Sequence, residues 1–170
     1  FRDAENYTTG KNQSLQFTQF TKFNLGASAG VKLNRFHQLS ANLISDRGMN
    51  IGYASLPMDV SLAQAWITSF QHSYKNDSAK IITEWTSKIY WNSIVHIMDD
   101  TKRPAVPIHM DMPGKSQTSG FLTTALMKKN AHDLTVTMNG FYNYSTAEMT
   151  MYPPNSSEAL MFMYTWPNVH

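Results

Sequence analysis

Hydrophobic and polar positions alternate regularly in the last third of the chain. From Leu134 to Met138 apolar residues alternate with threonines, and an alternating segment follows the pair Asn139 and Gly140. Asn and Gly both accept the positive φ angles of a type I′ turn, which joins two antiparallel strands. The pattern therefore predicts a β-hairpin over residues 133–145 with a two-residue turn at Asn139–Gly140.

Other segments rich in aromatic and β-branched residues predict additional strands. They cover residues 15–25, 38–44, 81–85, 89–98, 149–152 and 160–166. The first slips by one residue near Phe20, which is typical of a strand with a β-bulge. The 89–98 segment is apolar enough to predict a central strand buried on both faces, although a helix continuing from residue 79 is an alternative. Residues 107–118 contain Pro113-Gly114 and predict mostly loop.

One segment shows helical spacing instead. Ser61 and Gln64 fit a capping box a few residues after Pro57. Apolar residues then recur at intervals of three and four, which makes one stripe on a helix. The stripe consists of Leu62, Ala63, Trp66, Ile67, Phe70 and Tyr74. We therefore expect one inserted amphipathic helix over residues 61–75, whose Trp, Ile and Phe side chains are buried against a sheet.

The composition agrees with a β-rich domain. The chain has 170 residues, of which only 15% are charged, whereas ordinary soluble domains have about 25%. Closely spaced strands with a single helix favour an all-β fold, an antiparallel β-sandwich of jelly-roll type. We expect an extended N-terminal arm over residues 1–14 and a single β-sandwich domain over residues 15–170.

Three further features bear on compartment and origin. The chain contains no cysteine, which favours a bacterial, phage, viral or intracellular origin over a small secreted animal protein. There is no apolar run of about eighteen residues, so no membrane span is expected. The chain begins at Phe1 without an initiator Met, which suggests a processed or trimmed product.

Positive charge is concentrated in the N-terminal quarter. The net charge is only +2, and the chain has no Asp or Glu between Asn6 and Ser45. The cations of this stretch are Lys11, Lys22, Lys32 and Arg35. Their local potential makes them candidates for contacts with nucleic-acid phosphates, and phenylalanines interleave with Lys22 as in single-strand-binding grooves. A solvated arm followed by half-buried phenylalanines in a strand explains the same pattern.

A short motif raises the question of catalysis. The sequence Gly26-Ala27-Ser28-Ala29-Gly30 matches the G-x-S-x-G nucleophile elbow and resembles the esterase and lipase branch of the α/β-hydrolase family. The resemblance covers five residues and implies Ser28 as the nucleophile. Its partners would come from His109, His132, Asp99, Asp100, Asp111 and Asp133. The chain departs from the family in lacking βαβ units and in having only 25 residues before the motif begins at Gly26. We therefore expect a turn between strands, no catalytic residue and no enzyme.

Candidate metal ligands are few. His109 and Asp111 would share one face of a strand, which is the beginning of a metal site without a third ligand. Asp99-Asp100 offers clustered oxygens of the kind that Ca²⁺ prefers, although a solvated turn explains this pair as well. We expect no metal site and no cofactor.

These features favour a structural or recognition role. The strand, helix, strand order resembles the single jelly roll of small viral shell proteins. We therefore predict a self-assembling virion protein, such as a capsid subunit, that forms homo-oligomers in the virion and has packaged nucleic acid as a candidate partner. One alternative is a secreted or periplasmic sheet-plus-helix subunit of a bacterial secretion apparatus. The other is a small serine hydrolase that uses Ser28.

Overall fold

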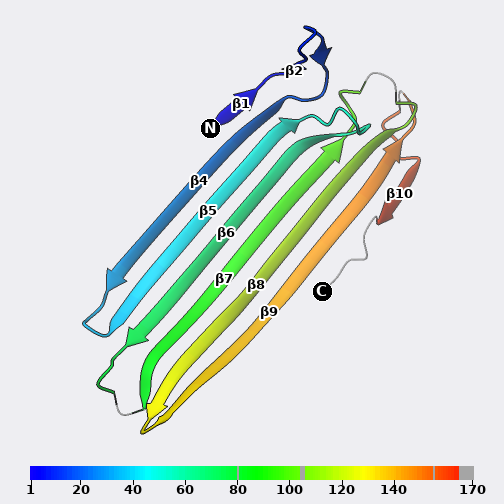
Figure 1. The fold of residues 1–170 in the computed structure, drawn as a ribbon. Coiled ribbons are helices and arrows are strands. Elements are labelled where there is room, and N and C mark those ends of the chain that lie inside the picture. Colours follow the sequence, from blue (N-terminus) through cyan, green and yellow to red (C-terminus); the bar gives the residue numbers. More distant parts are fainter. Residues whose placement is uncertain (80, 104–105, 155, 165–170) are drawn as a thin grey trace.

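The protein is a sheet of long antiparallel strands (Figure 1). The computed structural model describes residues 1–79, 81–103, 106–154 and 156–164. Within these residues the secondary structure consists of strands and turns, and the predicted helix is not present. The all-β, antiparallel class predicted from the sequence is therefore confirmed.

Eight of the ten strands form one sheet. The strands are β1 (Arg2–Ala4), β2 (Tyr7–Thr8), β3 (Ser14–Leu15), β4 (Phe20–Lys32), β5 (His37–Ile51), β6 (Asp59–Lys75), β7 (Ile82–Asp99), β8 (His109–Lys129), β9 (His132–Tyr152) and β10 (Met161–Tyr164). The order is β1-β4-β5-β6-β7-β8-β9-β10, while β2 and β3 form a separate two-stranded hairpin. From β4 onward each strand pairs with its neighbour in sequence. This order is a meander, and the predicted jelly-roll order is not seen.

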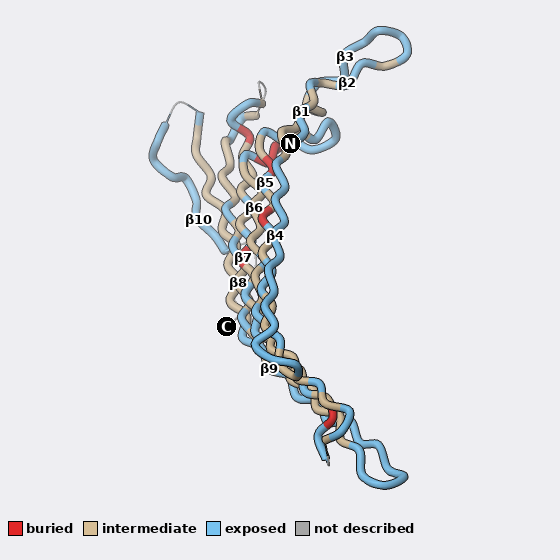
Figure 2. Tube along the Cα trace, turned by 90° about the vertical axis from the view of Figure 1, so that its left-hand side faces the viewer, coloured by how far each residue is buried: buried red, intermediate tan, exposed pale blue. Residues whose placement is uncertain are grey.

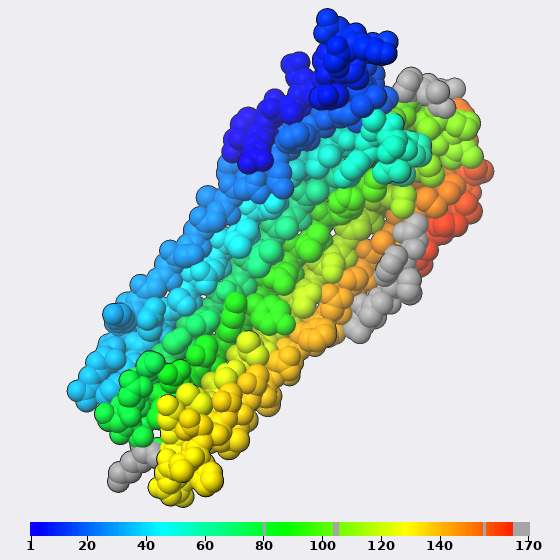
Figure 3. Space-filling model, in the orientation of Figure 1, coloured from blue at the N-terminus to red at the C-terminus, as the bar shows by residue number. Residues whose placement is uncertain are grey.

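The sheet is a single layer in the described residues. Figure 2 shows it edge-on as one thin, bent layer, and Figure 3 shows the long strands side by side across one broad face. The accessible surface is 11802 Å², whereas a compact protein of 19.3 kDa exposes about 8,500 Å². Among the described residues, Met58 and Val60 are the only buried hydrophobic side chains. The two facing layers expected for a sandwich are therefore not observed.

Strands β4 to β9 are unusually long. They contain 13 to 21 residues, whereas strands in globular proteins usually have about 3–10. Each inner strand is paired along most of its length on both sides. Backbone N–H and C=O groups are thereby satisfied within the sheet, and this pairing replaces a hydrophobic core as the main organising interaction.

The two ends of the sheet differ. At one end, which we call the turn end, the strands are joined by residues 33–36, 76–81 and 130–131. At the other, the loop end, the connections are residues 52–58, 100–108 and 153–160. The N-terminal segment with β2 and β3 also lies at the loop end (Figure 1).

The predicted C-terminal hairpin exists, but its turn lies elsewhere. Asn139 and Gly140 are in the middle of β9, and no glycine of the described residues has a positive φ. The two-residue turn is formed by Asn130, whose φ is 55°, and Ala131, so that Lys129 pairs with His132. The predicted position was wrong because β9 continues through Gly140 and pairs with β8 along nearly its whole length.

The predicted helix over 61–75 is also wrong, since these residues belong to β6. Trp66, Phe70 and Tyr74 are four residues apart, a spacing that aligns side chains on a helix and equally on a strand. Ile67 points to the opposite face of the sheet from Trp66. Ile67 and Phe70 are exposed and Trp66 is half-buried, so the predicted burial against a sheet is not observed.

Other local predictions are corrected as well. The predicted strand 89–98 is confirmed as part of β7, but its expected burial on both faces is not, because Ile89 is 60% exposed. Most of the predicted loop 107–118 belongs to β8. The predicted terminal strand is β10, and its last two positions, 165 and 166, lie outside the described residues.

Two glycines permit close approach of aromatic rings between strands. Gly120 of β8 lies opposite Tyr90 of β7, and the Tyr90 ring occupies the space that a side chain at Gly120 would fill. Gly140 of β9 lies opposite Phe121, whose ring covers it in the same way. Aromatic residues that cover strand glycines help to hold register in sheets.

We expect Gly120→Ala to lower the free energy of unfolding by about 1–3 kcal/mol, the cost of overpacking. A Cβ at Gly120 would meet the Tyr90 ring and, at 2.8 Å, the carbonyl oxygen of Gly140. Gly26→Ala is the matched control, since its Cβ would meet no atom within 4 Å. Urea unfolding followed by tryptophan fluorescence measures both variants, and equal effects would contradict the role of Gly120.

Candidate functional site

The register separates the long strands into two chemically different faces. One face, which we call the apolar face, has a central section without Asp, Glu, Lys or Arg. The section consists of Leu25, Ala27, Ala29 and Val31 of β4; Leu39, Ala41, Leu43 and Ser45 of β5; Trp66, Thr68, Phe70, His72 and Tyr74 of β6; Trp85, Ser87, Ile89, Trp91 and Ser93 of β7; Gln117, Ser119, Phe121, Thr123, Ala125 and Met127 of β8; and Leu134, Val136, Met138, Gly140, Tyr142 and Tyr144 of β9.

Large apolar side chains remain exposed on this face. Ile89 is 60% and Tyr142 is 59% exposed, and several neighbours are similar. Aromatic residues border the section: Trp66 lies near the loop end, and Tyr74 lies opposite Trp85 near the turn end. An apolar surface that extends across six strands is far larger than the patches of ordinary soluble monomers. The face is therefore suited to contact with an apolar environment.

Several polar side chains on the apolar face bond to one another or to the backbone. The indole Nε1 of Trp85 donates to Oγ1 of Thr123 at 2.9 Å, and the hydroxyl groups of Ser87 and Thr123 are 2.7 Å apart. His37 and His72 share a hydrogen bond of 3.0 Å between Nδ1 and Nε2. Internal partners of this kind lower the cost of removing polar groups from water.

The opposite face, which we call the polar face, has a different chemistry. In the same rows it carries mainly Ser, Thr, Asn and Gln side chains, with a few interspersed apolar residues such as Ile67. Asn143 donates to Oγ1 of Thr118 at 2.7 Å, and Ser28 donates to Oδ1 of Asn42 at 2.8 Å. Uncharged hydrogen-bonding groups of this density suit a water-wetted surface.

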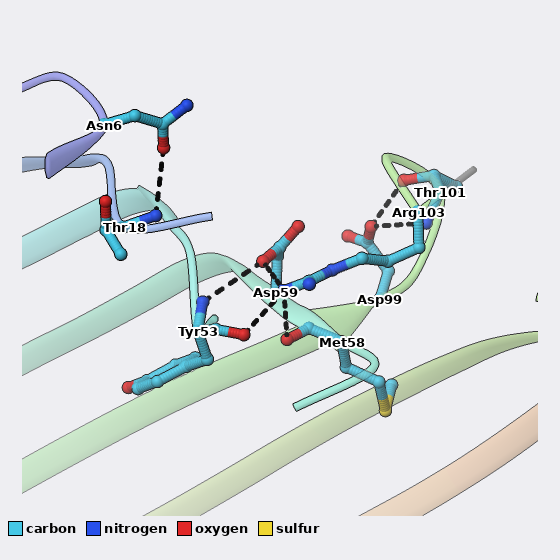
Figure 4. Close-up of polar contacts among 8 residues, drawn as sticks. All are labelled: Asn6, Thr18, Tyr53, Met58, Asp59, Asp99, Thr101 and Arg103. Atoms are coloured by element: carbon cyan, nitrogen blue, oxygen red, sulfur yellow. Dashed lines mark hydrogen bonds and ion pairs between the residues drawn. The ribbon is translucent and has the colours of Figure 1, made fainter. Parts of the chain in front are cut away.

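A buried ion pair holds the loop end together (Figure 4). The guanidinium of Arg103 pairs with the carboxylate of Asp59, and their side chains are 8% and 5% exposed. Arg103 also donates to the carbonyl oxygens of Tyr53 and Met58 at 3.0 and 3.2 Å. Its guanidinium lies 3.6 Å from the ring centroid of Phe17. One side chain thereby links the N-terminal segment with the loops after β5 and β7.

A second polar group at the loop end surrounds Asp100, which is almost completely buried. Its carboxylate lies 3.0 Å from Nδ1 of His109 and accepts a hydrogen bond from the backbone N–H of Met110. Burial, together with the charges of Asp99 and Asp100, raises the pKa of Asp111 above its ordinary value. No group of three or more His, Cys, Asp or Glu in the described residues could hold a metal ion. The contact that the structure shows for the His109 side chain is the one with Asp100.

The structure does not bring the four predicted nucleic-acid contacts together. Lys11 lies between β2 and β3 at the loop end, whereas Lys32 and Arg35 lie at the turn end. Lys22 lies on the polar face and pairs with Asp46 at 3.2 Å. No observation on the described residues supports a nucleic-acid role, which stays a prediction from the sequence.

Ser28 lies within β4, not on a strand-to-helix turn. Its hydroxyl bonds to Asn42, and His109 and His132 are at opposite ends of the sheet (Figure 1). The G-x-S-x-G pattern is therefore part of a strand here. The described part of the chain also contains no helix with the length and hydropathy required to cross a membrane.

Arg103→Ala is expected to reduce stability by about 3–5 kcal/mol, because it leaves Asp59 charged, buried and unpaired. The double variant Arg103→Ala/Asp59→Ala should cost less than the sum of the single variants. Lys75→Ala is the control, since the Lys75–Glu84 pair is exposed and should matter little. Equilibrium unfolding measures all four proteins, and strict additivity at the buried pair would contradict this role.

Comparison with known proteins adds a fold relationship. No protein-family model and no curated protein sequence matches this chain. A solved structure described as the copper transporter OprC aligns with a TM-score of 0.76 and 16% sequence identity. The alignment covers 95% of this chain and 26% of that chain, so the chain spans about a quarter of the matched structure. At this identity the likeness shows a shared fold.

This match corrects the function predicted from the sequence. The long meander of β4 to β9 is shared with part of a transporter and is not the jelly roll of a viral shell. A capsid subunit, and a location in the virion, are therefore wrong. The match agrees better with the alternative prediction, a secreted or periplasmic component of a bacterial secretion apparatus, than with a virion protein.

Proposed function

We propose that this chain forms part of the wall of a membrane transport protein. Its long strands cross a lipid bilayer with the apolar face toward lipid and the polar face toward a water-filled interior. The observation that carries the proposal is the central section of the apolar face, which has no charged residue and remains exposed over six strands. A place in a lipid bilayer agrees better with a component of a bacterial cell envelope than with a capsid subunit of a virion.

The dimensions of the apolar face support this placement. On β8 its charge-free section runs from Gln117 to Met127, and a strand needs about 9–11 residues to cross a bilayer at a tilt. The aromatic residues at its borders, such as Trp66 and Trp85, are of the type that gathers at the two membrane–water interfaces. The charged residues Arg47 and Lys115 of this face lie beyond Trp66, toward the loop end.

The sheet edges indicate that the wall continues. Among the described residues, β1 covers only Phe20–Lys22 of β4, and β10 covers only Glu148–Met151 of β9. The remaining edges expose backbone N–H and C=O groups, which have no partners in hydrocarbon. In a membrane, further strands of the same protein would therefore pair with β4 and β9.

The polar face supports a transport role. Its Ser, Thr, Asn and Gln side chains would line an aqueous interior, as the inward residues of membrane-crossing sheets do. The likeness to part of a transporter adds support at the level of the fold. The alternative is that a second sheet covers the apolar face, as in a sandwich, and the following experiment separates the two.

Because the chain has no cysteine, single cysteines can report the environment of each face. We expect a polarity-sensitive fluorophore to be blue-shifted at Ile89→Cys and Met138→Cys, but not at the neighbouring Lys88→Cys and Asn139→Cys. Nitroxide lipids in reconstituted vesicles should quench only the first pair. Blue-shifted probes that lipid nitroxides do not quench would show a protein layer over the face and would reject membrane placement.

Ile89→Arg should impair insertion, because an arginine at the lipid-facing midplane of a strand costs about 2–4 kcal/mol. Thr86→Arg is the matched control on the polar face of the same strand, and it should insert normally. Folding into vesicles is followed by the heat-dependent shift in gel mobility or by protease protection. Equal insertion of the two variants would contradict the assignment of the faces.

A further inference from the structure

Methionines that are distant in sequence meet at the loop end of the sheet. Seven of the eleven methionines lie in β7 to β10 near this end. Met98 is opposite Met112, Met110 is opposite Met151, Met151 is opposite Met161, and Met149 is opposite Met163. We call these seven residues the methionine patch.

All members of the methionine patch lie on one face. Residues opposite each other in an antiparallel pair share a face, and so do residues two apart on one strand. Met110 and Met112 are two apart on β8, and Met149 and Met151 are two apart on β9. On β9 this series continues the polar face, which includes Asn143. The patch is therefore an extension of the polar face toward the loops.

The spacing allows several sulfur atoms to converge. The Cβ atoms of opposite residues are about 4.5–5.5 Å apart, and residues two apart on a strand are separated by about 7 Å. A methionine side chain has three rotatable bonds and adapts to its surroundings. Two or three thioethers can therefore reach one point above the sheet. Met161 and Met163 are exposed and the other five are half-buried, so the patch is open to solvent at its β10 side.

A histidine adjoins the methionine patch on the same face. His96 is two residues before Met98 on β7, and it is exposed. The residue opposite His96 is Gly114, which has no side chain. The imidazole can therefore lean over Gly114 toward Met112, the next residue of that face on β8. This arrangement adds a nitrogen ligand at the border of the thioether cluster.

The chemistry of these ligands selects a particular class of cation. Thioether sulfur is soft and uncharged, so it binds hard divalent cations poorly and prefers Cu(I). Imidazole is also a suitable copper ligand. We propose that the methionine patch with His96 binds Cu(I), or the chemically similar Ag(I), as cargo on the water-facing side of the wall. The assignment of this side rests on the proposed function, whereas binding itself does not.

Binding can be measured on the whole chain in detergent micelles. The protein is labelled with ¹³C at the methionine methyl groups and titrated with Ag(I), and Cu(I) affinity is measured by competition with bicinchoninate under reducing, anaerobic conditions. We expect the methyl signals of the methionine patch to shift, while those of Met49, Met58, Met127 and Met138 do not. Zn²⁺ should leave all of them unchanged.

A volume-conserving variant tests the ligands without disturbing the sheet. Met110→Leu, Met112→Leu, Met149→Leu and Met151→Leu together should weaken Cu(I) binding at least about tenfold, since even second-shell changes at metal sites cost about 10–100-fold. The control is Met127→Leu/Met138→Leu, which removes two methionines of the apolar face far from the patch and should bind normally. Circular dichroism checks that both variants retain their sheet.

The outcomes separate this inference from the proposed function. Unshifted methionine-patch signals, or equal Cu(I) affinity in the two leucine variants, would overturn the metal site even if the cysteine probes show a lipid-facing apolar face. The site would be supported if Ag(I) shifts only the methyl signals of the methionine patch and if the variant with four leucines loses Cu(I) affinity. This result would hold even if the cysteine probes reject membrane placement.

Discussion

The hydrogen-bonded ladder between long antiparallel strands is the interaction on which the rest of this molecule depends. Only Met58 and Val60 are buried hydrophobic side chains among the described residues, so no packed interior holds the strands in place. The inner strands β5 to β8 instead use both of their edges, and the backbone satisfies its own donors and acceptors along nearly their whole length. Cross-strand contacts, such as the Tyr90 ring over Gly120, then secure the register. A sheet with this organisation requires surroundings that can cover its apolar side.

The same ladder decides what each face presents. Because neighbouring residues of a strand point to opposite sides, the register collects aromatic and aliphatic side chains on one face and small hydrogen-bonding side chains on the other. Some of the polar atoms that remain on the apolar face, such as those of Trp85 and Thr123, bond to each other. This division is the physical basis of the proposal that lipid lies on one side of the sheet and water on the other.

The two ends of the sheet have different roles. Tight connections such as Asn130–Ala131 close the turn end, whereas the loop end contains a buried ion pair between Arg103 and Asp59. That pair connects the N-terminal segment to the loops after β5 and β7. The methionine patch lies on the polar face at the same end of the strands.

The sequence by itself determined the all-β class, several strand segments and the presence of a hairpin in the last third of the chain. It did not determine where the hairpin turns, because Asn139–Gly140 favours a turn only when no partner strand continues past it, and β8 does continue. Likewise, the four-residue spacing of Trp66 and Phe70 is compatible with a helix and with a strand. The segment forms a strand because its backbone pairs with β5 on one side and with β7 on the other. The methionine patch is scattered from Met98 to Met163 in sequence, and only the register brings it together. Local preferences are worth a fraction of a kcal/mol to about 1 kcal/mol per residue, so a complete ladder of backbone hydrogen bonds overrides them, and that ladder exists only in the tertiary structure.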